Sequence, residues 1–418
     1  MRVLLYETSA DGHRLAYVAS LLPDLLSLIP DITVALPKCD LASPEYESWL
    51  RPFADRVTID AFDTGKVQLR PATGGDRAKY LLQSIAKARA EHVYVPSADG
   101  LAQSITHHLP YRLARGFESE AGLHRGAFAY ATHGLAAWKQ SASLALLAAS
   151  PWNLLHFVDV IPYLWIRARG GRLAARSRML PDPVRRLAEH RKVDARKALG
   201  IPEDGRYVAS TGLMTARKGI ALLLHAMDTA PLRSDDRLLL TGRFDPDMRA
   251  LIDGPYAHLV KSGRVIVVDR YLYEHELALT LSAADLVATP YIGHVGIASI
   301  VTRAASVGRP ILANDTGWNG VIVPRVGLGW TCSATADGIA AKLPAALDDA
   351  MTYTPPPSAV RFLEFHDISN FRASLAARLR ERLGHPPSPD LHTWDWVLTG
   401  DPNAGPQPLA RGDDRVRI

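Results

Sequence analysis

The sequence TGLMTARKGIALLLHAM, residues 211–227, decides the fold because it joins a strand to a helix through a short loop. Tyr207–Thr211 has the composition of a strand, and the apolar residues after Gly219 recur with helical spacing. The loop between them carries adjacent cations at Arg217 and Lys218. A strand that leads through a short loop into a helix is the unit from which parallel α/β sheets are built.

The same alternation of short strands and longer helices continues on both sides of this stretch. The N-terminal series has expected strands at Val3–Tyr6, Ile32–Leu36, Val57–Phe62, His92–Pro96 and Phe128–Thr132. The C-terminal series has expected strands at Tyr207–Thr211, Arg237–Thr241, Val265–Val268, Leu286–Pro290 and Pro310–Ala313. The predicted fold class is therefore α/β, with two Rossmann-like parallel-sheet domains.

Charge and proline content place the predicted domain boundaries. Arg167–Lys197 carries 11 Arg and Lys residues and only three acidic residues, and it lies between the two series. The last 33 residues hold six prolines and three glycines, a composition that does not easily form a packed core. We expect an N-terminal domain at 1–185, a C-terminal domain at 195–368, a final helix at 369–385 and an extended tail at 386–418.

The composition excludes several classes of protein. The 418 residues are 47% hydrophobic and 22% charged, which is typical of a soluble globular protein. A net charge of +5 is too weak to argue for nucleic acid, and two distant cysteines exclude a disulfide scaffold. The histidines follow no metal-binding pattern, so no metal is expected. With no signal-peptide pattern and no apolar run of about 20 residues, we expect a cytoplasmic protein.

In open parallel sheets, ligands bind where strands end and helices begin. In the N-terminal domain, Gly12 follows the first strand and permits close approach of the backbone to an anion. Next to it, His13 is a candidate donor to a phosphate or to an acceptor hydroxyl; the alternative is a surface histidine beside a capping Asp11. His133 follows the expected strand at 128–132 and points to a binding role, although a lone histidine is more often structural.

In the C-terminal domain, Arg217 and Lys218 coincide with a strand end and a helix N-terminus, which suits a diphosphate. The alternative is a solvated basic turn. The loop after the strand at 286–290 contains His294 and small residues that leave backbone amides open to a ligand. At its end, Ser299 either caps the next helix or donates to phosphate.

Residues 211–227 and 283–320 resemble the donor-binding domain of retaining GT-B glycosyltransferases of the large GT4-like group. In that group the first segment has Gly-Arg-Leu, a short gap, Lys-Gly, and then Leu-Leu and Ala. LPDPV at 180–184 resembles the group's interdomain junction, and the likeness extends over about residues 130–385. The resemblance implies that the two domains face each other across a cleft and that the last helix crosses back to the first domain.

The resemblance also assigns roles to individual positions. It makes Lys218 the diphosphate-binding lysine, supported by Arg217, and it makes His133 the first-domain histidine near the donor sugar. Together these three form the expected catalytic set. The expected donor-binding set is Gly12, His13, Gly212, Arg270, Tyr271, His294, Gly296, Ala298 and Ser299, with Arg270 and Tyr271 beside the nucleobase.

Three positions depart from the group's pattern. The phosphate-binding arginine falls on Leu213, and the paired glutamates that normally bind the sugar and the ribose fall on Val295 and Arg303. These departures leave the base and the sugar of the donor open. The expected reaction is still metal-independent transfer of a sugar from a nucleotide diphosphate sugar to an acceptor hydroxyl, with retention and without a cofactor. The alternative is a catalytically silent subunit that binds nucleotide sugars.

The acceptor is expected to be a sugar, a glycan, a lipid-linked sugar or a small molecule that binds the N-terminal domain. The span Arg167–Arg178 carries five arginines and no acid beside Trp165. Basic and aromatic residues together suit an anionic lipid surface, so peripheral contact with the inner face of the membrane is one expectation. A solvated helix face is the alternative.

Overall fold

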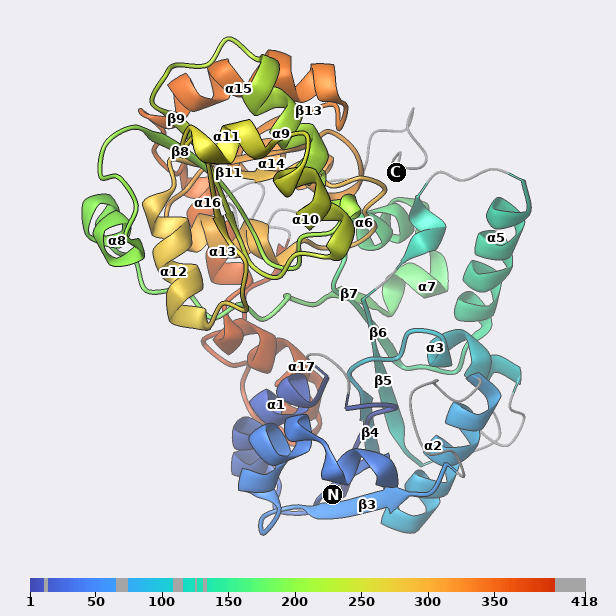
Figure 1. The fold of residues 1–418 in the computed structure, drawn as a ribbon. Coiled ribbons are helices and arrows are strands. Elements are labelled where there is room, and N and C mark those ends of the chain that lie inside the picture. Colours follow the sequence, from blue (N-terminus) through green and yellow to red (C-terminus); the bar gives the residue numbers. More distant parts are fainter. Residues whose placement is uncertain (11–13, 65–73, 108–115, 125, 131–133, 395–418) are drawn as a thin grey trace. The chain divides into compact units, whose positions relative to one another are not determined.

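The computed structural model describes residues 1–10, 14–64, 74–107, 116–124, 126–130 and 134–394. Within these ranges the chain forms two compact units, each built around its own parallel sheet (Figure 1). Unit 1 takes its described residues from Met1–Pro183 and Ile368–Thr393, and unit 2 consists of Val184–Asp367 and Trp394. The predicted α/β fold class is confirmed.

Unit 1 holds a seven-stranded parallel sheet in the order β3-β2-β1-β4-β5-β6-β7. Its strands are β1 Val3–Tyr6, β2 Ile32–Pro37, β3 Thr58–Phe62, β4 His92–Val95, β5 Glu118–Leu123, β6 Leu154–Phe157 and β7 Ser177–Met179. Its helices are α1 Arg14–Leu28, α2 Gly74–Ala88, α3 Leu101–Ser104, α5 Gly134–Ala149, α6 Val160–Arg169, α7 Gly171–Ala175 and α17 Ile368–Arg382. Short turns are η1 Lys38–Ala42, η2 Tyr46–Leu50, η3 Arg51–Phe53, η4 Ile105–His107 and η5 Ala127–Ala129.

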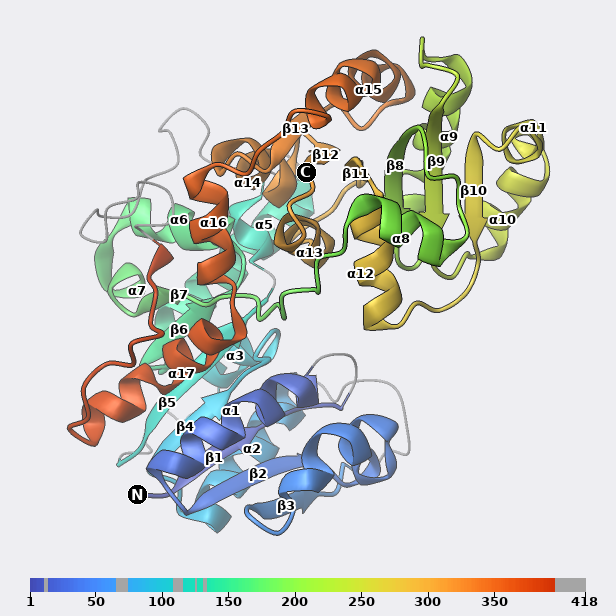
Figure 2. The same ribbon diagram turned by 90° about the vertical axis from the view of Figure 1, so that its left-hand side faces the viewer.

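The last helix, α17, packs in unit 1 although it follows unit 2 in the chain. It lies beside α1 (Figure 2), where the rings of Tyr17 and Phe371 are 5.4 Å apart. From the sheet, the hydroxyl of Tyr94 donates to the carbonyl oxygen of Leu375 at 2.6 Å. The predicted return of the last helix to the first domain is therefore confirmed.

Unit 2 holds a six-stranded parallel sheet in the order β10-β9-β8-β11-β12-β13. Its strands are β8 Arg206–Thr211, β9 Asp236–Thr241, β10 Val265–Val268, β11 Leu286–Thr289, β12 Ile311–Asn314 and β13 Gly329–Cys332. Its helices are α8 Lys192–Leu199, α9 Ile220–Thr229, α10 Pro246–Asp253, α11 Ala257–Lys261, α12 Glu274–Ala283, α13 Ser299–Ser306, α14 Gly317–Arg325, α15 Ala336–Ala350 and α16 Pro357–Phe365, with a short turn η6 Ala216–Lys218.

The central strands of unit 2 are buried along their whole length because helices cover both faces of the sheet (Figure 1). Every residue of β8 and β11 is buried. Leu223, Leu224 and Met227 of α9 pack into the same core as Leu238 and Leu240 of β9. This packing fixes the strand ends, and so it positions the loops that leave them.

One expected strand, Phe128–Thr132, is wrong in residues 128–130, and its last two residues lie outside the described residues. Phe128 lies in η5, and the position in the sheet belongs to β5, a strand that the sequence pattern did not indicate. The run around Phe128 is buried and apolar, and periodicity cannot separate such a short run from a buried turn. β5 was missed because it carries two carboxylates, Glu118 and Glu120, whose partners come from distant segments.

The described residues contain no helix that is both long and apolar enough to cross a membrane.

Candidate functional site

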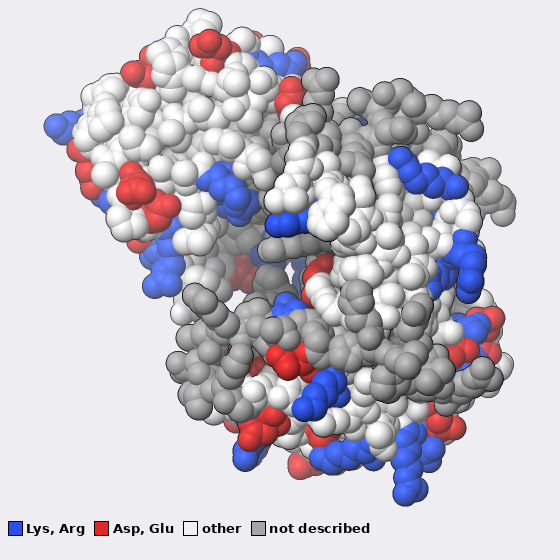
Figure 3. Space-filling view, turned by 90° about the vertical axis from the view of Figure 1, so that its right-hand side faces the viewer, with Lys and Arg blue, Asp and Glu red and all other residues white. Residues whose placement is uncertain are grey.

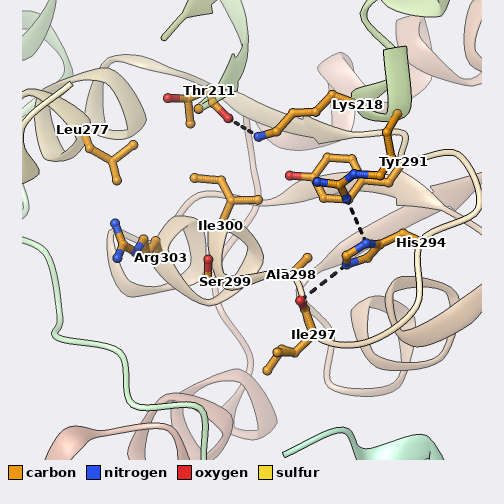
Figure 4. Close-up of a pocket in the computed structure, with 12 residues that line it drawn as sticks. Thr211, Lys218, Leu277, Tyr291, His294, Ile297, Ala298, Ser299, Ile300 and Arg303 are labelled. Atoms are coloured by element: carbon orange, nitrogen blue, oxygen red, sulfur yellow. Dashed lines mark hydrogen bonds between the residues drawn. The ribbon is translucent and has the colours of Figure 1, made fainter. Parts of the chain in front are cut away.

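A cavity of about 270 Å³ lies at the carboxyl end of the sheet in unit 2 (Figure 4). This is the edge at which open parallel sheets bind their ligands. Its walls come from the end of β8, η6, α12, the loop after β11 and the first turns of α13. The lining residues are Thr211, Gly212, Arg217, Lys218, Leu277, Tyr291, His294, Ile297, Ala298, Ser299, Ile300 and Arg303.

Two glycines with left-handed backbone angles shape the loop after β8. Gly212 has a φ of 107°, and a Cβ atom there would lie 2.8 Å from Nζ of Lys218. Gly219 has a φ of 70°, and a Cβ atom there would lie 2.3 Å from the carbonyl oxygen of Pro290. The loop can approach β11 and Lys218 this closely because both positions lack a side chain.

Lys218 is the buried cation of the cavity, with 8% of its surface exposed. Its Nζ donates to the carbonyl oxygen of Thr211 and lies 5.3 Å from the centre of the Tyr291 ring. Burial, with a smaller contribution from the neighbouring charge of Arg217, lowers the pKa of Lys218 to about 8. A bound anion would therefore stabilise the charged form of this buried lysine.

Arg217 is exposed and interacts with the loop after β11. Its Nη1 donates to Nδ1 of His294 at 2.9 Å, and its guanidinium lies 5.5 Å from the centre of the Tyr291 ring. Because arginine can only donate, Nδ1 of His294 accepts, which leaves Nε2 as the donor toward the carbonyl oxygen of Ile297 at 3.4 Å. The histidine thus connects the cation-bearing loop to the start of α13.

The N-terminus of α13 forms the floor of the cavity. The helix begins at Ser299 after Ala298, and no side chain caps it. The free amides of its first turn and the helix dipole favour an anion there. Four residues further on, Arg303 also lines the cavity. The lining residues thus include three cations and no carboxylate, which is the chemistry of an anion site.

The structure brings together six of the residues that the sequence singled out. Gly296, Arg270 and Tyr271 are not among the lining residues. Arg270 pairs with Glu276 at 2.6 Å, and Tyr271 is 64% exposed on the surface. Those in the cavity are Gly212, Arg217, Lys218, His294, Ala298 and Ser299. Three further predicted residues, Gly12, His13 and His133, lie outside the described residues.

Sequence reasoning missed several residues of the cavity. Thr211 is the last residue of β8 and Tyr291 follows β11 closely, so the rule that ligands bind at strand ends points to both. Leu277 lies in the middle of α12, and nothing in its local sequence indicates a contact with a ligand.

Unit 1 carries a second notable group at the corresponding edge of its sheet. Glu7 follows β1 directly and is fully buried. It accepts from the amide of Thr8 at 3.3 Å, and Nη1 of Arg14 lies 3.9 Å from its Oε2. Burial, only partly offset by Arg14, raises the pKa of Glu7 to about 7. Such perturbed groups cluster at functional sites, and no sequence pattern singles Glu7 out.

No family model matches the chain. In sequence it is 28% identical over 200 residues to a GDP-mannose:glycolipid 4-beta-D-mannosyltransferase of Xanthomonas campestris pv. campestris, over 47% of this chain and 54% of that protein. A second protein of that name and pathovar is 31% identical over 140 residues, 33% of this chain and 38% of its own length. The chain thus spans about half, or less, of the curated relatives that it matches.

Solved structures cover far more of the chain. HepE of Anabaena, determined in complex with UDP, matches 91% of this chain and 100% of its own with a TM-score of 0.66 and 14% identity. Sucrose-phosphate synthase of Thermosynechococcus elongatus matches 92% of this chain and 100% of its own, with a TM-score of 0.67 and 18% identity. The chain has the GT-B fold that its sequence predicts.

Proposed function

We propose that the chain is a glycosyltransferase that moves a sugar from a nucleotide diphosphate sugar to an acceptor hydroxyl. The observation that carries the proposal is the buried Lys218 in a carboxylate-free cavity against the N-terminus of α13. The names of the curated relatives, which specify GDP-mannose and a glycolipid, support the same reaction class.

In this reaction the bond from the anomeric carbon to the diphosphate breaks, and the acceptor oxygen forms the new bond. Negative charge grows on the departing diphosphate. Lys218, Arg217 and the first amides of α13 would stabilise it, because fixed cations and dipoles aimed at developing charge lower the barrier. We propose on the same ground that these groups take the role a divalent metal would otherwise have, so that transfer is metal-independent.

The GT4-like resemblance implies retention, in which the departing phosphate takes the proton of the acceptor and no carboxylate base is required. Inversion would instead require a positioned base. The relatives are named for a β-mannosyl product, which an α-linked donor such as GDP-mannose gives only with inversion, so their names point against retention. The anomeric coupling of the product, measured by NMR against that of the donor, therefore tests retention directly.

The proposed function predicts a selective response to nucleotides. Among UDP, GDP, ADP and their sugar derivatives, one base should raise the melting temperature, with a stabilisation of about 2.7 kcal/mol at a hundredfold excess over its Kd. The matching sugar nucleotide should then be consumed when acceptor extract is added, in EDTA as well as in Mg²⁺. No stabilisation by any nucleotide would refute the proposal. Stabilisation without transfer or hydrolysis would instead support the silent-subunit alternative.

We further propose that the protein is cytoplasmic and that its acceptor is lipid-linked. It would reach this acceptor at the inner face of the membrane, which it contacts through α5. Leu135 and Trp138 on this helix are each 67% exposed. Figure 3 looks onto this side of unit 1, where separate Lys and Arg groups border a broad uncharged area. Of the nearby arginines, Arg172 is exposed, whereas the guanidinium of Arg176 donates to the carbonyl oxygens of Leu147 and neighbouring residues.

The membrane proposal predicts that the protein floats with anionic vesicles and not with neutral ones. An exposed aromatic side chain and nearby cations both favour an anionic interface, by about 1 kcal/mol per cation. Trp138→Ser should reduce the bound fraction several-fold. Met351→Ser, which removes another exposed apolar side chain in unit 2, should leave it unchanged. Equal flotation of the wild type on neutral and anionic vesicles would overturn this proposal without affecting the transferase assignment.

A further inference from the structure

The strand order of unit 1 reverses between β1 and β4, because β2 and β3 lie on one side of β1 and β4 to β7 lie on the other. Open parallel sheets bind ligands at the carboxyl ends of the strands beside such a reversal. The proposed reaction needs an acceptor site besides the donor cavity, and this edge is where unit 1 would offer one. His124 lies at this edge, because it directly follows β5, the neighbour of β4.

Contacts from several segments hold His124 in place. A Cβ atom at Gly122 would lie 2.1 Å from the carbonyl oxygen of Pro96, so the missing side chain lets the end of β5 approach the residues after β4. Nε2 of His124 lies 3.1 Å from the same carbonyl oxygen. The ring stacks on that of Tyr17 of α1, with the ring centres 5.4 Å apart and an angle of 4° between the planes. The backbone amide of His124 donates to Oδ2 of Asp99 at 3.2 Å.

These contacts fix which nitrogen of the ring can take a proton. A carbonyl oxygen only accepts, so Nε2 carries the hydrogen of the neutral ring and Nδ1 keeps its lone pair. Among the described residues, Nδ1 has no hydrogen-bond partner, and the residue is partly exposed. His124 is thus oriented by its neighbours with an unused proton acceptor, which is the state that a general base requires.

The carboxylates that follow other strands of this sheet are less suited to take a proton from a substrate. Glu7 and Asp159 are completely buried, and Asp159 accepts from the hydroxyl of Tyr130 at 2.5 Å. Asp182 is buried as well and accepts from the hydroxyl of Tyr17 at 3.0 Å. A general base must come within hydrogen-bond distance of the hydroxyl that it deprotonates, which favours the partly exposed His124.

We propose that His124 is the general base of the transfer and that the acceptor hydroxyl binds at the carboxyl edge of the sheet in unit 1. The inference rests on the proposed function and, unlike the GT4-like resemblance, it implies inversion. Nδ1 takes the proton of the acceptor hydroxyl while the acceptor oxygen forms its bond to the anomeric carbon.

The other half of the step balances the charges. The bond from the anomeric carbon to the diphosphate breaks on the opposite face of the sugar, and its electron pair leaves with the diphosphate. The protonated ring still donates from Nε2 to the carbonyl oxygen of Pro96 and then releases its new proton to water. An α-linked donor gives a β-linked product in this way, which agrees with the β-mannosyl product in the names of the curated relatives.

The test measures transfer from the accepted sugar nucleotide to the acceptor extract. His124→Gln can keep the donation to Pro96 but cannot take a proton, so its rate should fall by about 10²–10⁴-fold. Its melting temperature should stay close to that of the wild type, and its Kd for the free nucleoside diphosphate should stay within twofold. Added imidazole should raise the rate of His124→Ala at least tenfold. His385→Gln, which removes an exposed histidine elsewhere in unit 1, is the control and should transfer at the wild-type rate.

Each other outcome has a definite meaning. If His124→Gln transfers within threefold of the wild type, or if NMR shows that the product keeps the anomeric configuration of the donor, the inference is wrong while the transferase assignment stands. If imidazole has no effect on His124→Ala, or if His124→Gln loses nucleotide binding together with transfer, His124 has a structural role and the inference is again wrong. If the wild type binds no nucleotide at all, the proposed function itself fails.

Discussion

Lys218→Met should lower kcat/KM by two to three orders of magnitude and should weaken binding of the nucleoside diphosphate. Removing one preorganised group that stabilises developing negative charge typically has an effect of about 10²–10³ in rate. Methionine keeps the length and fills the same buried space, so a cavity is not created. Because burial disfavours the charged lysine, the unliganded variant should be at least as stable as the wild type.

This stability makes the prediction specific. A variant that loses activity but melts at the same or a higher temperature has lost chemistry rather than its fold. Arg217→Gln is the matched control, because Arg217 is exposed and donates a hydrogen bond to His294. The decrease in kcat/KM for this variant should be several-fold smaller. Activity of Lys218→Met within threefold of the wild type would contradict the assignment of Lys218 to the diphosphate.

The pH dependence of binding gives an independent readout of Lys218. In the unliganded protein its pKa is lowered to about 8 from the ordinary 10.5, and a bound diphosphate would raise it again by favouring the charged form. The affinity for the diphosphate ligand should therefore be constant below pH 8 and should fall as the pH rises above 8, by up to about tenfold per pH unit. Lys218→Met should remove this fall. A wild-type affinity that stays constant up to pH 9.5 would contradict the role of Lys218 in binding the diphosphate.

The sequence was informative wherever a local pattern determines the structure. Val265–Val268 is an apolar run and Tyr207–Thr211 is rich in strand-forming residues, and both lie within strands. Lys218 and Ser299 were singled out because strand ends and helix starts are visible in the sequence, and ligands bind there. Both line the cavity.

It was uninformative wherever distant segments supply the partner. β5 has the sequence ESEAGL, which looks like an exposed loop until Arg378 and two histidines are placed against its carboxylates. Leu277 reaches the cavity only through the packing of α12. Arg270 and Tyr271, predicted beside the nucleobase from a family pattern, do not line the cavity, and their role stays a prediction.

The carboxylate of Glu120 has a central role in the stability of unit 1. It lies in β5 and is 2% exposed. Its Oε1 accepts from Nε2 of His92 at 2.8 Å, and its Oε2 accepts from Nε2 of His156 at 2.6 Å. Arg382 of α17 donates to Nδ1 of His92 at 3.1 Å, so the same cluster connects the sheet to the last helix. Burial alone would raise the pKa of Glu120, but the hydrogen bonds from the two histidines outweigh it and hold the pKa at about 2.

Glu120→Ala should therefore lower the free energy of unfolding by about 3–5 kcal/mol, because it leaves two buried histidines without their acceptor. Glu118→Ala is the matched control two residues away on the same strand. Its partner Arg378 lies at the surface, so the loss there should be about 1 kcal/mol or less. Urea denaturation at pH 7 with unchanged m-values measures both variants.

Because the pKa of Glu120 is depressed from 4.5 to about 2, its contribution to stability is complete above pH 4.5 and is lost as the pH falls toward 2. The gap between the wild type and Glu120→Ala should narrow over that range, and equal losses for the two variants at pH 7 would contradict the central role of Glu120.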